Sequence, residues 1–396
     1  MRNARAPVVL LGGLNIVRAL GLAQIPVIIA SSERRTPSMA SRYCAGTIEL
    51  PPIAERERYV ETLVRAGRRL AAAHGAPVPL FYDNDDRLAL VQDCRAELAP
   101  HFALLLNEPA LADALLDKAR FQDLAERCSL PVPRRIPWEA LDAEEGPVLI
   151  KPKTRTAWDH SSIRLQLFGG SGKARVFPHG KAIVKNRLAA QLAPQLSFQE
   201  YVPGDDTAIW SLHGFAAPGG ELLEWFVGRK IRTYPALTGD SSYLELAYDP
   251  DLVALGGDVA RRLGLAGIFK MDFKRSAATG RFYLLEINTR FNLWHYLGAA
   301  SGVNLPRVAY EYLLHGTQPQ HVAPRLGLRW LHFAYDRRAY RDLGMSRARW
   351  IASLLQAPKV YELFSWSDPA PFARYWTTRI RAALGRRMHR WLATAS

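Results

Sequence analysis

The sequence predicts a mixed α/β protein, and three observations lead to this fold class. The chain opens with a strand, a glycine loop, a helix and a second strand, a βαβ order that is typical of a parallel sheet. A later segment has the pattern of two apolar strands joined by a short turn. The final segment is basic and rich in tryptophan. No apolar run is long enough for a transmembrane helix, so we expect none.

The opening unit lies within residues 8–30. Val8–Leu11 predicts a buried strand, Asn15–Gly21 the start of a helix and Pro26–Ala30 the next strand. Gly12-Gly13 predicts a tight loop whose backbone amides can approach a ligand. A complete G-x-G-x-x-G is missing, so a dinucleotide site is not favoured. Polar residues interrupt the apolar stretch, so we expect no secretion signal and a cytoplasmic protein.

Cysteine use agrees with a reducing compartment. Cys44, Cys94 and Cys128 are the three cysteines of the chain, and none forms a C-x-x-C pair. Their spacing predicts neither a disulfide framework nor a zinc site.

Cations that could meet phosphates follow the first domain. Lys118 lies on a predicted amphipathic helix, and Lys151 ends the strand Val148–Pro152, where a lysine is expected to meet an anion. The loop Phe168–Lys173 is rich in glycine, and Gly170 and Lys173 in it could cradle a phosphate. This loop lacks the residues of a Walker A motif.

The most informative segment is a predicted β-hairpin. Gly267–Lys274 and Phe282–Arg290 have strand patterns, and the residues between them favour a turn. Glu286 and Asn288 are two apart and project from one face, and Asp272 lies on the partner strand. Hard oxygen ligands of this kind suit Mg²⁺ held jointly with phosphates.

In this order and spacing, the motifs resemble the ATP-grasp superfamily over roughly residues 8–317. Glu286–Arg290 is the sharpest element of the resemblance. The resemblance implies a Rossmann-like N-terminal domain (1–107) and an ATP-grasp domain (108–317) whose two α+β subdomains clamp ATP. A basic, Trp-rich helical extension (318–396) follows.

The resemblance also implies a role for each candidate residue. Residues implied to bind the phosphates of ATP are Lys118, Lys151, Gly170 and Lys173. Residues implied to line the adenine site are Gln199, Glu200 and Val202, and Asp206 would bind the ribose. Two Mg²⁺ ions, for which Mn²⁺ can substitute, are assigned to Asp272, Glu286 and Asn288. Lys151 and Arg290 are the implied catalytic residues, and Arg290 would steady the transferred phosphoryl group or acyl phosphate.

Two departures from the family pattern affect these roles. Lys151 and Gly169 are 18 positions apart, farther than the pattern usually has. Either the insert Arg155–Gln166 or the loop Gly169–Lys173 would therefore close over the phosphates, and both alternatives stay open. Asp206 is shorter than the usual Glu.

Further motifs narrow the resemblance. Phe226–Arg232, Ser241–Tyr243 and Phe291–His295 look like the carboxylate–amine ligase branch, near D-aspartate ligases. This branch implies small-molecule carboxylate and amine substrates, an acyl-phosphate intermediate, and release of ADP and phosphate. Homodimers are common among resembling enzymes, but the sequence leaves the oligomeric state open. We expect Arg229 and Arg232 to bind a substrate carboxylate and His295 to contact substrate. The alternatives are an ATP-dependent carboxylase or carbamoyl-phosphate-type enzyme, and a non-catalytic nucleotide-sensing module at a membrane surface.

The tail carries much of the net charge. Of the formal charge of +15, residues 318–396 supply +10, from 14 Arg or Lys against 4 Asp or Glu, and they hold five of the ten Trp. Three interpretations stay open. The tail lies on an anionic membrane surface at the inner face of the membrane, binds nucleic acid, or packs on the rest of the chain with its arginines in solvent. Packing is preferred, and nucleic acid is not an expected partner.

Overall fold

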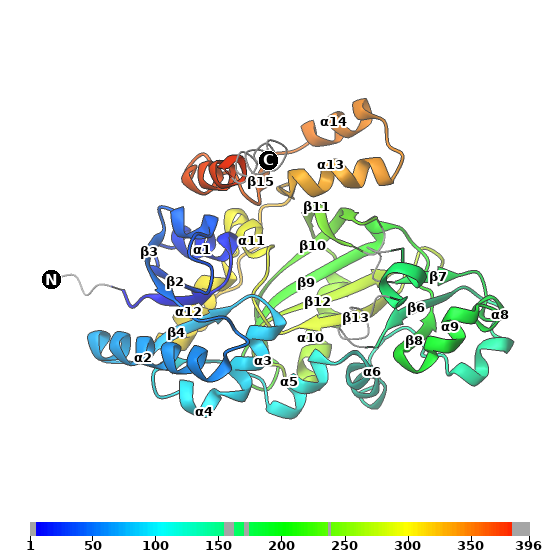
Figure 1. Cartoon of the computed structure of the whole chain (residues 1–396), viewed down its shortest axis with the longest axis horizontal. Helices are drawn as coiled ribbons and strands as arrows, with labels where there is room; N and C mark the ends of the chain where they lie inside the picture. Colours follow the sequence, from blue (N-terminus) through cyan, green and yellow to red (C-terminus); the bar gives the residue numbers. More distant parts are fainter. Residues whose placement is uncertain (1–4, 154–161, 170–173, 237–238, 382–396) are drawn as a thin grey trace, which may run out of the picture.

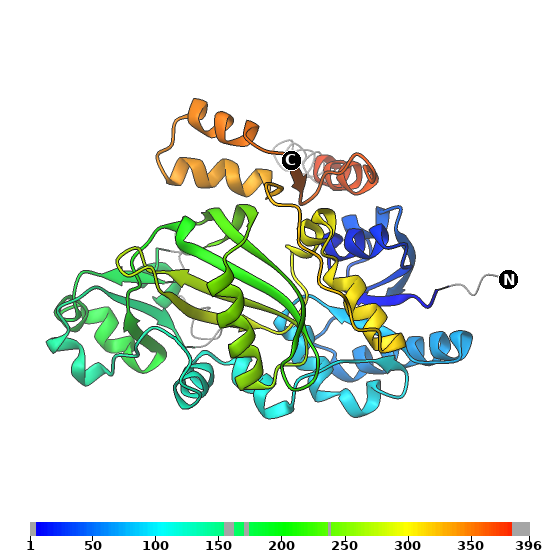
Figure 2. The ribbon, with the colours of Figure 1, turned by 180° about the vertical axis from the view of Figure 1, so that it is seen from behind.

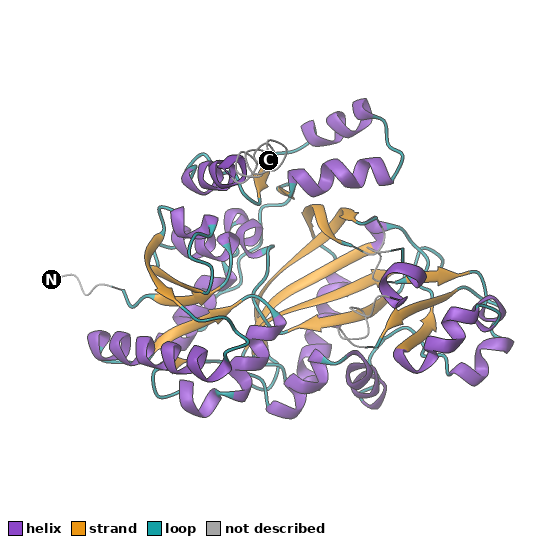
Figure 3. Cartoon of the chain, in the orientation of Figure 1, coloured by secondary structure: helices purple, strands orange, loops and turns teal. Residues whose placement is uncertain are grey.

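The computed structural model describes residues 5–153, 162–169, 174–236 and 239–381. Three sheets lie along the long axis of the molecule, with a parallel sheet at one end, a large sheet in the middle and a small sheet at the other end (Figure 1). Of the C-terminal extension, the described residues 329–381 lie across the top of the first two (Figures 1 and 2). The mixed α/β class predicted from the sequence is confirmed (Figure 3).

The N-terminal sheet is parallel, with strand order β3-β2-β1-β4-β5. Its strands are β1 (Val8–Leu11), β2 (Val27–Ser31), β3 (Cys44–Glu49), β4 (Val78–Tyr82) and β5 (Phe102–Ala103). Its helical segments are α1 (Leu14–Leu22), the short 3-10 helix η1 (Pro37–Ala40), α2 (Arg56–His74), α3 (Asp85–Asp93) and α4 (Arg95–Leu98).

Both faces of this sheet are covered, which explains the unbroken apolar run of β1. Val8 and Leu10 belong to one buried cluster, and Val9 and Leu11 belong to another on the opposite face. All four side chains are fully buried. A strand buried on both faces has no solvent side that would select polar residues.

The small sheet is antiparallel, with strand order β7-β6-β8. Its strands are β6 (Val148–Pro152), β7 (Arg175–Phe177) and β8 (Leu196–Glu200). The helical segments before and around it are α5 (Pro109–Leu116), α6 (Lys118–Arg127), η2 (Trp138–Ala143), the π-helix η3 (Ser162–Leu167), α8 (Gly180–Val184), α9 (Arg187–Leu192) and η4 (Ala193–Gln195).

The large sheet has seven strands, in the order β13-β12-β9-β10-β11-β14-β15. Its strands are β9 (Ile209–Ala216), β10 (Leu222–Tyr234), β11 (Asp240–Ala247), β12 (Gly267–Arg275), β13 (Phe282–Asn288), β14 (Arg329–Leu331) and β15 (Lys359–Tyr361). The 3-10 helix η5 (Asp206–Ala208) precedes β9, and the remaining helices are α10 (Pro250–Leu263), α11 (His295–Ser301), α12 (Leu305–His315), α13 (Phe333–Asp342) and α14 (Arg347–Leu355).

One face of the large sheet is apolar because α10 packs against it. Leu252 and Val259 of α10 share a buried cluster with Leu212 and Met271 of the sheet. Side chains alternate between the two faces of a strand, so the residues between these positions project from the other face. That other face carries the polar residues of the candidate site.

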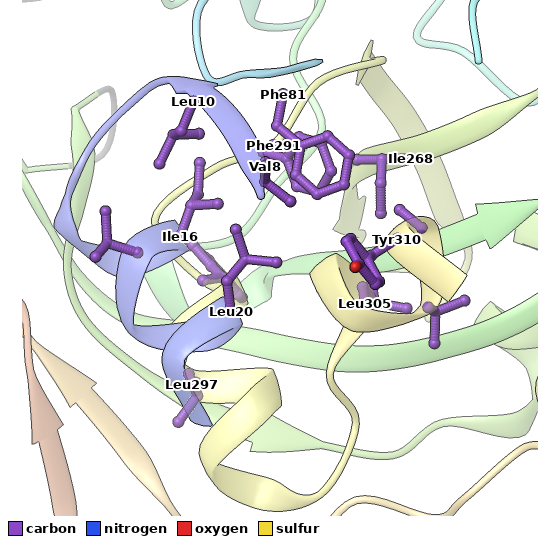
Figure 4. Close-up of a cluster of buried hydrophobic side chains, with 14 of the residues drawn as sticks. Val8, Leu10, Ile16, Leu20, Phe81, Ile268, Phe291, Leu297, Leu305 and Tyr310 are labelled. Carbon is purple, nitrogen blue, oxygen red and sulfur yellow. The ribbon is translucent and has the colours of Figure 1, made fainter. Parts of the chain in front are cut away.

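A single buried cluster joins the N-terminal sheet to the large sheet. Figure 4 shows Val8, Ile16 and Leu20 of the first domain close to Ile268 and Phe291, with residues of α11 and α12 completing the group. Phe81 stacks on Phe291 with ring centroids 4.3 Å apart. The N-terminal domain and the large sheet therefore share one core.

The C-terminal extension is more than a helical appendage. Its strands β14 and β15 add to the edge of the large sheet, and β14 pairs with Tyr243–Glu245 of β11. Residues 370–381 form a further helix. The strands are three residues long, which is too short for the sequence pattern to predict. No helix in the described ranges is long and apolar enough to cross a membrane.

Two buried ion pairs fasten the extension. Arg18 of α1 donates from Nε to Asp368 at 3.0 Å, and both side chains are 1% exposed. Arg232 of β10 donates two hydrogen bonds of 2.8 Å to Asp336 of α13. Each pair is shielded from water, so the loss of one partner leaves a buried charge without compensation.

We expect Asp368→Ala to lower the free energy of unfolding by about 3–5 kcal/mol, because the Arg18 guanidinium would stay buried without a counter-charge. Urea and thermal unfolding of the full chain measure this loss. Glu49→Ala is the matched control, because the pair of Glu49 with Arg34 is exposed and should contribute at most about 1 kcal/mol. Equal effects of the two substitutions would contradict the role given to Asp368.

Candidate active site

The polar face of the large sheet collects charged side chains from strands β10, β12 and β13. In the β12–β13 pair, Asp272 lies opposite Glu286 and Lys270 lies opposite Asn288. Residues directly opposite each other in an antiparallel pair project from the same face. The hairpin predicted from the sequence is therefore present, and its three oxygen-bearing side chains share one face with Lys270.

Asp272 is the buried centre of this group. Its side chain is 6% exposed, one carboxylate oxygen accepts from Lys270 Nζ at 2.6 Å, and the other accepts from the Ser211 hydroxyl. Burial alone would raise the pKa of Asp272, but the ammonium groups of Lys270 and Lys230 hold it well below the usual value. Asp272 is therefore ionised over the working pH range.

Lys230 and Lys270 are site residues that the sequence analysis missed. Lys230 of β10 is 9% exposed, and burial lowers its pKa while the charge of Asp272 partly opposes this shift. Lys270 also lies 5.6 Å from the centroid of the Trp294 ring. Strand alternation was a usable signal for Lys270, because a lysine two positions before Asp272 must share its face.

Lys151, on β6 of the small sheet, adds a positive charge that interacts with Glu286 of the hairpin. Burial and, to a smaller extent, the positive charge of Lys118 together lower the pKa of Lys151 to about 8, while the negative charge of Glu286 partly opposes this shift. These couplings bring together Lys118, Lys151 and Glu286, which come from three separate elements. Lys118 is the first residue of α6, the amphipathic helix expected from the sequence. Asp117 is the N-cap of this helix and separates it from α5.

Arg290 links this site to the N-terminal domain. Its guanidinium bonds the carboxylate of Asp85 and the backbone oxygen of Asp83, and it donates to Asn288 Oδ1 at 3.2 Å. Asp83 in turn accepts from the backbone amide of Gly13 at 2.7 Å. The loops that follow β1 and β4 therefore meet the end of β13 at the carboxyl edge of the parallel sheet, where ligands of such sheets commonly bind.

The donor set fits a divalent cation that is shared with a phosphate ligand. Glu286 is exposed, and Asn288 Nδ2 donates to its Oε1 at 3.1 Å. No group of three or more His, Cys, Asp or Glu in the described residues is arranged to hold a metal ion. Asp272, Glu286 and Asn288 supply two carboxylates and one amide, which suits Mg²⁺ that completes its shell with phosphate oxygens and water.

The predicted adenine and ribose residues lie on and after β8. Gln199 and Val202 are buried, and the Glu200 carboxylate accepts from the backbone amide of Arg134 at 2.9 Å. Asp206 accepts from the backbone amide and the hydroxyl of Thr233, both at 2.8 Å. The carboxylate of Asp206 thus ties the turn after β8 to β10, and its ribose role stays a prediction. Gly170 and Lys173 lie outside the described residues, as do residues 155–161 of the insert.

The structure does not support the substrate roles predicted for Arg232 and His295. The Arg232 guanidinium is 4% exposed and fully engaged with Asp336, which also accepts from Trp350 Nε1 at 2.7 Å. His295 is completely buried, and burial lowers its pKa to about 3. Both side chains were expected near substrate because they follow or precede site residues, yet each points into a packed interior.

Arg229 remains partly exposed but also has partners. It bonds Glu245 of the neighbouring strand and lies 5.5 Å from the centroid of the Trp210 ring. Glu245 is shared with Arg329 of β14, at 3.1 Å. A substrate carboxylate would therefore have to compete with Glu245 for Arg229, and the predicted role stays a prediction.

Comparisons with known proteins agree with this arrangement. A family profile described as "ATP-grasp in the biosynthetic pathway with Ter operon" matches residues 195–334, which hold β9, β10 and the hairpin. A biotin carboxylase from Campylobacter jejuni, solved as a β-γ-ATP complex, superposes with a TM-score of 0.58 and 14% identity, covering 82% of this chain and 74% of that one. The chain has an ATP-grasp fold. The resemblance drawn from the sequence is confirmed at the level of the fold.

Two further proteins are similar to this chain, one in structure and one in sequence. An L-amino acid ligase from Bacillus licheniformis has a TM-score of 0.54 and 11% identity, covering 80% of this chain and 75% of that one. D-alanine–D-alanine ligase B from Xanthomonas campestris pv. campestris is 29% identical over 152 residues, which are 36% of this chain and 42% of the ligase. The chain therefore spans less than half of this curated relative.

Lys151 should give the ATP affinity of the protein a pH dependence. A protonated ammonium attracts phosphate, and with a pKa of about 8 this charge is lost as the pH rises through that value. We expect ATP binding to weaken roughly tenfold from one pH unit below to one unit above this pKa. Calorimetric titration with ATP across this pH range measures the effect.

Lys151→Arg should make the ATP affinity nearly independent of pH in this range, because a guanidinium stays charged at these pH values. Lys153→Arg is the matched control, since Lys153 is close in sequence but donates to the backbone oxygen of Pro194. A wild-type profile in Lys151→Arg would contradict the assignment.

Arg232→Ala should act on stability rather than on substrate binding. We expect a loss of about 3–5 kcal/mol in the free energy of unfolding, because Asp336 would be left buried and unpaired. Asp336→Ala should cost a similar amount, and the double substitution should cost less than the sum of the two. A raised KM for a carboxylate substrate with unchanged stability would restore the substrate role.

Proposed function

We propose that this protein is an ATP-dependent carboxylate–amine ligase that forms an amide bond and releases ADP and phosphate. The observation that carries the proposal is the meeting of four lysines with Asp272, Glu286 and Asn288 between the large and the small sheet. Lys118, Lys151, Lys230 and Lys270 supply positive charge from four different elements. A triphosphate is the common ligand that needs this much positive charge beside oxygen donors for a cation.

The proposed reaction has two steps. A carboxylate oxygen of the first substrate attacks the γ-phosphorus of ATP, the bond from that phosphorus to the β–γ bridging oxygen breaks, and ADP leaves. The amine of the second substrate then attacks the carbonyl carbon of the acyl phosphate, phosphate leaves, and the amine loses a proton. Phosphoryl transfer of this kind depends on positioning and charge neutralisation more than on covalent catalysis. No nucleophilic side chain is needed.

Each residue of the site has a place in this proposal. Lys118 and Lys151 hold phosphate oxygens, and Arg290, already placed beside Asn288, steadies the transferred group. Asp272, Glu286 and Asn288 would hold Mg²⁺, for which we propose two ions with Mn²⁺ as a substitute. Bound there, the metal would neutralise charge on the phosphates during transfer. For Asp272 to bind a metal, its contact with Lys270 must loosen.

The buried carboxylate of Asp272 also compensates the charge of the two lysines beside it. Its negative charge offsets the repulsion between Lys230 and Lys270, which would otherwise be costly at this burial. We propose a cytoplasmic location and a homodimer. Small-molecule substrates agree with the names of the ligases that share the fold, the L-amino acid ligase and the D-alanine–D-alanine ligase.

Trapping of an acyl phosphate tests the proposal. The protein is incubated with Mg²⁺-ATP, hydroxylamine and a panel of amino acids and small diacids, and both ADP and hydroxamate are measured. We expect one acid to give a hydroxamate in step with ADP release. Glu286→Ala should lower the rate roughly a hundredfold or more, because a lost metal ligand removes several kcal/mol of charge stabilisation.

Glu139→Ala is the matched control, because Glu139 is an exposed carboxylate on η2 and is not part of the β12–β13 hairpin. ADP release that depends on bicarbonate and gives no hydroxamate with any acid would favour a carboxylase or carbamoyl-phosphate-type enzyme. ATP binding without turnover for every acid would favour a nucleotide sensor.

A further inference from the structure

Exposed apolar side chains gather on the C-terminal extension. Among the described residues, 17 large hydrophobic side chains are exposed, and nine of them lie within residues 333–380. Trp366 is 89% exposed and Leu355 is 80% exposed, the two highest values in this group. Solvent contact of this extent is costly for such side chains, so this surface is suited to an apolar partner.

The exposed charge on the same segment has one sign. Within the described residues 333–381, seven arginines are exposed, and Asp342 is the single exposed acid. Of the other three acids of this segment, Asp336 and Asp368 are buried in ion pairs with Arg232 and Arg18, and Glu362 is half-buried. Internal pairing thus removes negative charge from the outer surface and leaves it strongly basic.

The combination of these two features selects the partner. We propose that the C-terminal extension binds an anionic lipid surface. Tryptophan suits the boundary between headgroups and acyl chains, and each arginine near an anionic bilayer adds attraction. Leu355, Ile351 and Ile380 are exposed aliphatic side chains, for which the acyl region is a good solvent.

Two other partners fit the surface less well. A second copy of this chain would bring arginines against arginines in a symmetric interface, where each surface meets itself. A nucleic acid would satisfy the arginines but would leave the exposed aliphatic side chains without an apolar environment, since its binding depends chiefly on phosphate contacts.

The extension is held firmly enough to present this surface. Arg18–Asp368 ties it to the N-terminal domain, and Arg232–Asp336 ties it to the large sheet. Figures 1 and 2 show α13, α14 and the helix of residues 370–381 along one side of the molecule, away from the small sheet. Residues 382–396, outside the described part, add three arginines and a tryptophan and no acid to the sequence. Lipid binding goes beyond the proposed ligase activity and does not depend on it.

Vesicle flotation of the full-length protein tests the proposal. Vesicles of phosphatidylcholine alone are compared with vesicles of phosphatidylcholine mixed with phosphatidylglycerol, at low and at high salt. We expect binding to the anionic vesicles, weakening with salt because the attraction is screened, and little binding to the neutral ones. Equal binding to both, or to neither, would overturn the proposal.

Paired substitutions locate the binding surface. Trp366→Ser with Trp376→Ser, and separately Arg379→Gln with Arg381→Gln, should each weaken vesicle binding roughly tenfold or more. Tyr248→Ser and the pair Arg68→Gln with Arg69→Gln are matched controls, because these residues are exposed elsewhere on the chain. The controls should bind like the wild type.

Folding of each variant is checked by its thermal unfolding and ATP binding, which exposed substitutions should leave unchanged. Two further results would overturn the proposal. One is binding of duplex DNA, without vesicle binding, that is lost in the arginine variant. The other is a concentration-dependent dimer, without vesicle binding, that is lost in the tryptophan variant.

Discussion

Asp272 compensates the positive charge that gathers on the polar face of the large sheet. Lys230 and Lys270 are both largely removed from water on the same face, where the nearby carboxylate of Asp272 compensates their positive charge. Asp272 supplies this carboxylate from a position where the Ser211 hydroxyl and strand pairing on both sides hold it. The hairpin, β9 and β10 therefore act as one electrostatic unit. Ligand phosphates would enter a region whose positive charge is already in place, although the contact of Lys270 with Asp272 would have to loosen for a metal.

The parts of this arrangement that the sequence predicted depend on short-range patterns. Strand alternation placed Glu286 and Asn288 on one face, and the intervening turn paired them with Asp272. The apolar run of β1 and the glycine loop after it predicted the parallel sheet in the same way. Lys270 could have been found by this rule, whereas Lys230 could not, because its strand is irregular on both sides of Arg232.

Other features depend on contacts between distant residues, which leave no local signal. Nothing near Arg232 indicates that Asp336, on a helix of the C-terminal extension, will neutralise it. An arginine in a strand next to site residues favours a substrate role until its partner is known. The strands β14 and β15 also depend on a distant contact, because a three-residue strand forms only where a sheet edge is already available. Prediction failed where tertiary contacts decide what a side chain does.

The contact between Arg18 and Asp368 has a consequence for the order in which the chain can fold. Arg18 belongs to the first helix, but its partner follows 350 positions later. A ribosome therefore exposes nearly the whole chain before the N-terminal domain can satisfy its buried guanidinium. Chains that stop before Asp368 would lack part of the segment that pairs with this guanidinium, so Arg18 and the surface around it would lose that cover. Such products would open more readily than complete chains, so cellular proteases could distinguish finished from unfinished molecules by a defect at the opposite end of the sequence.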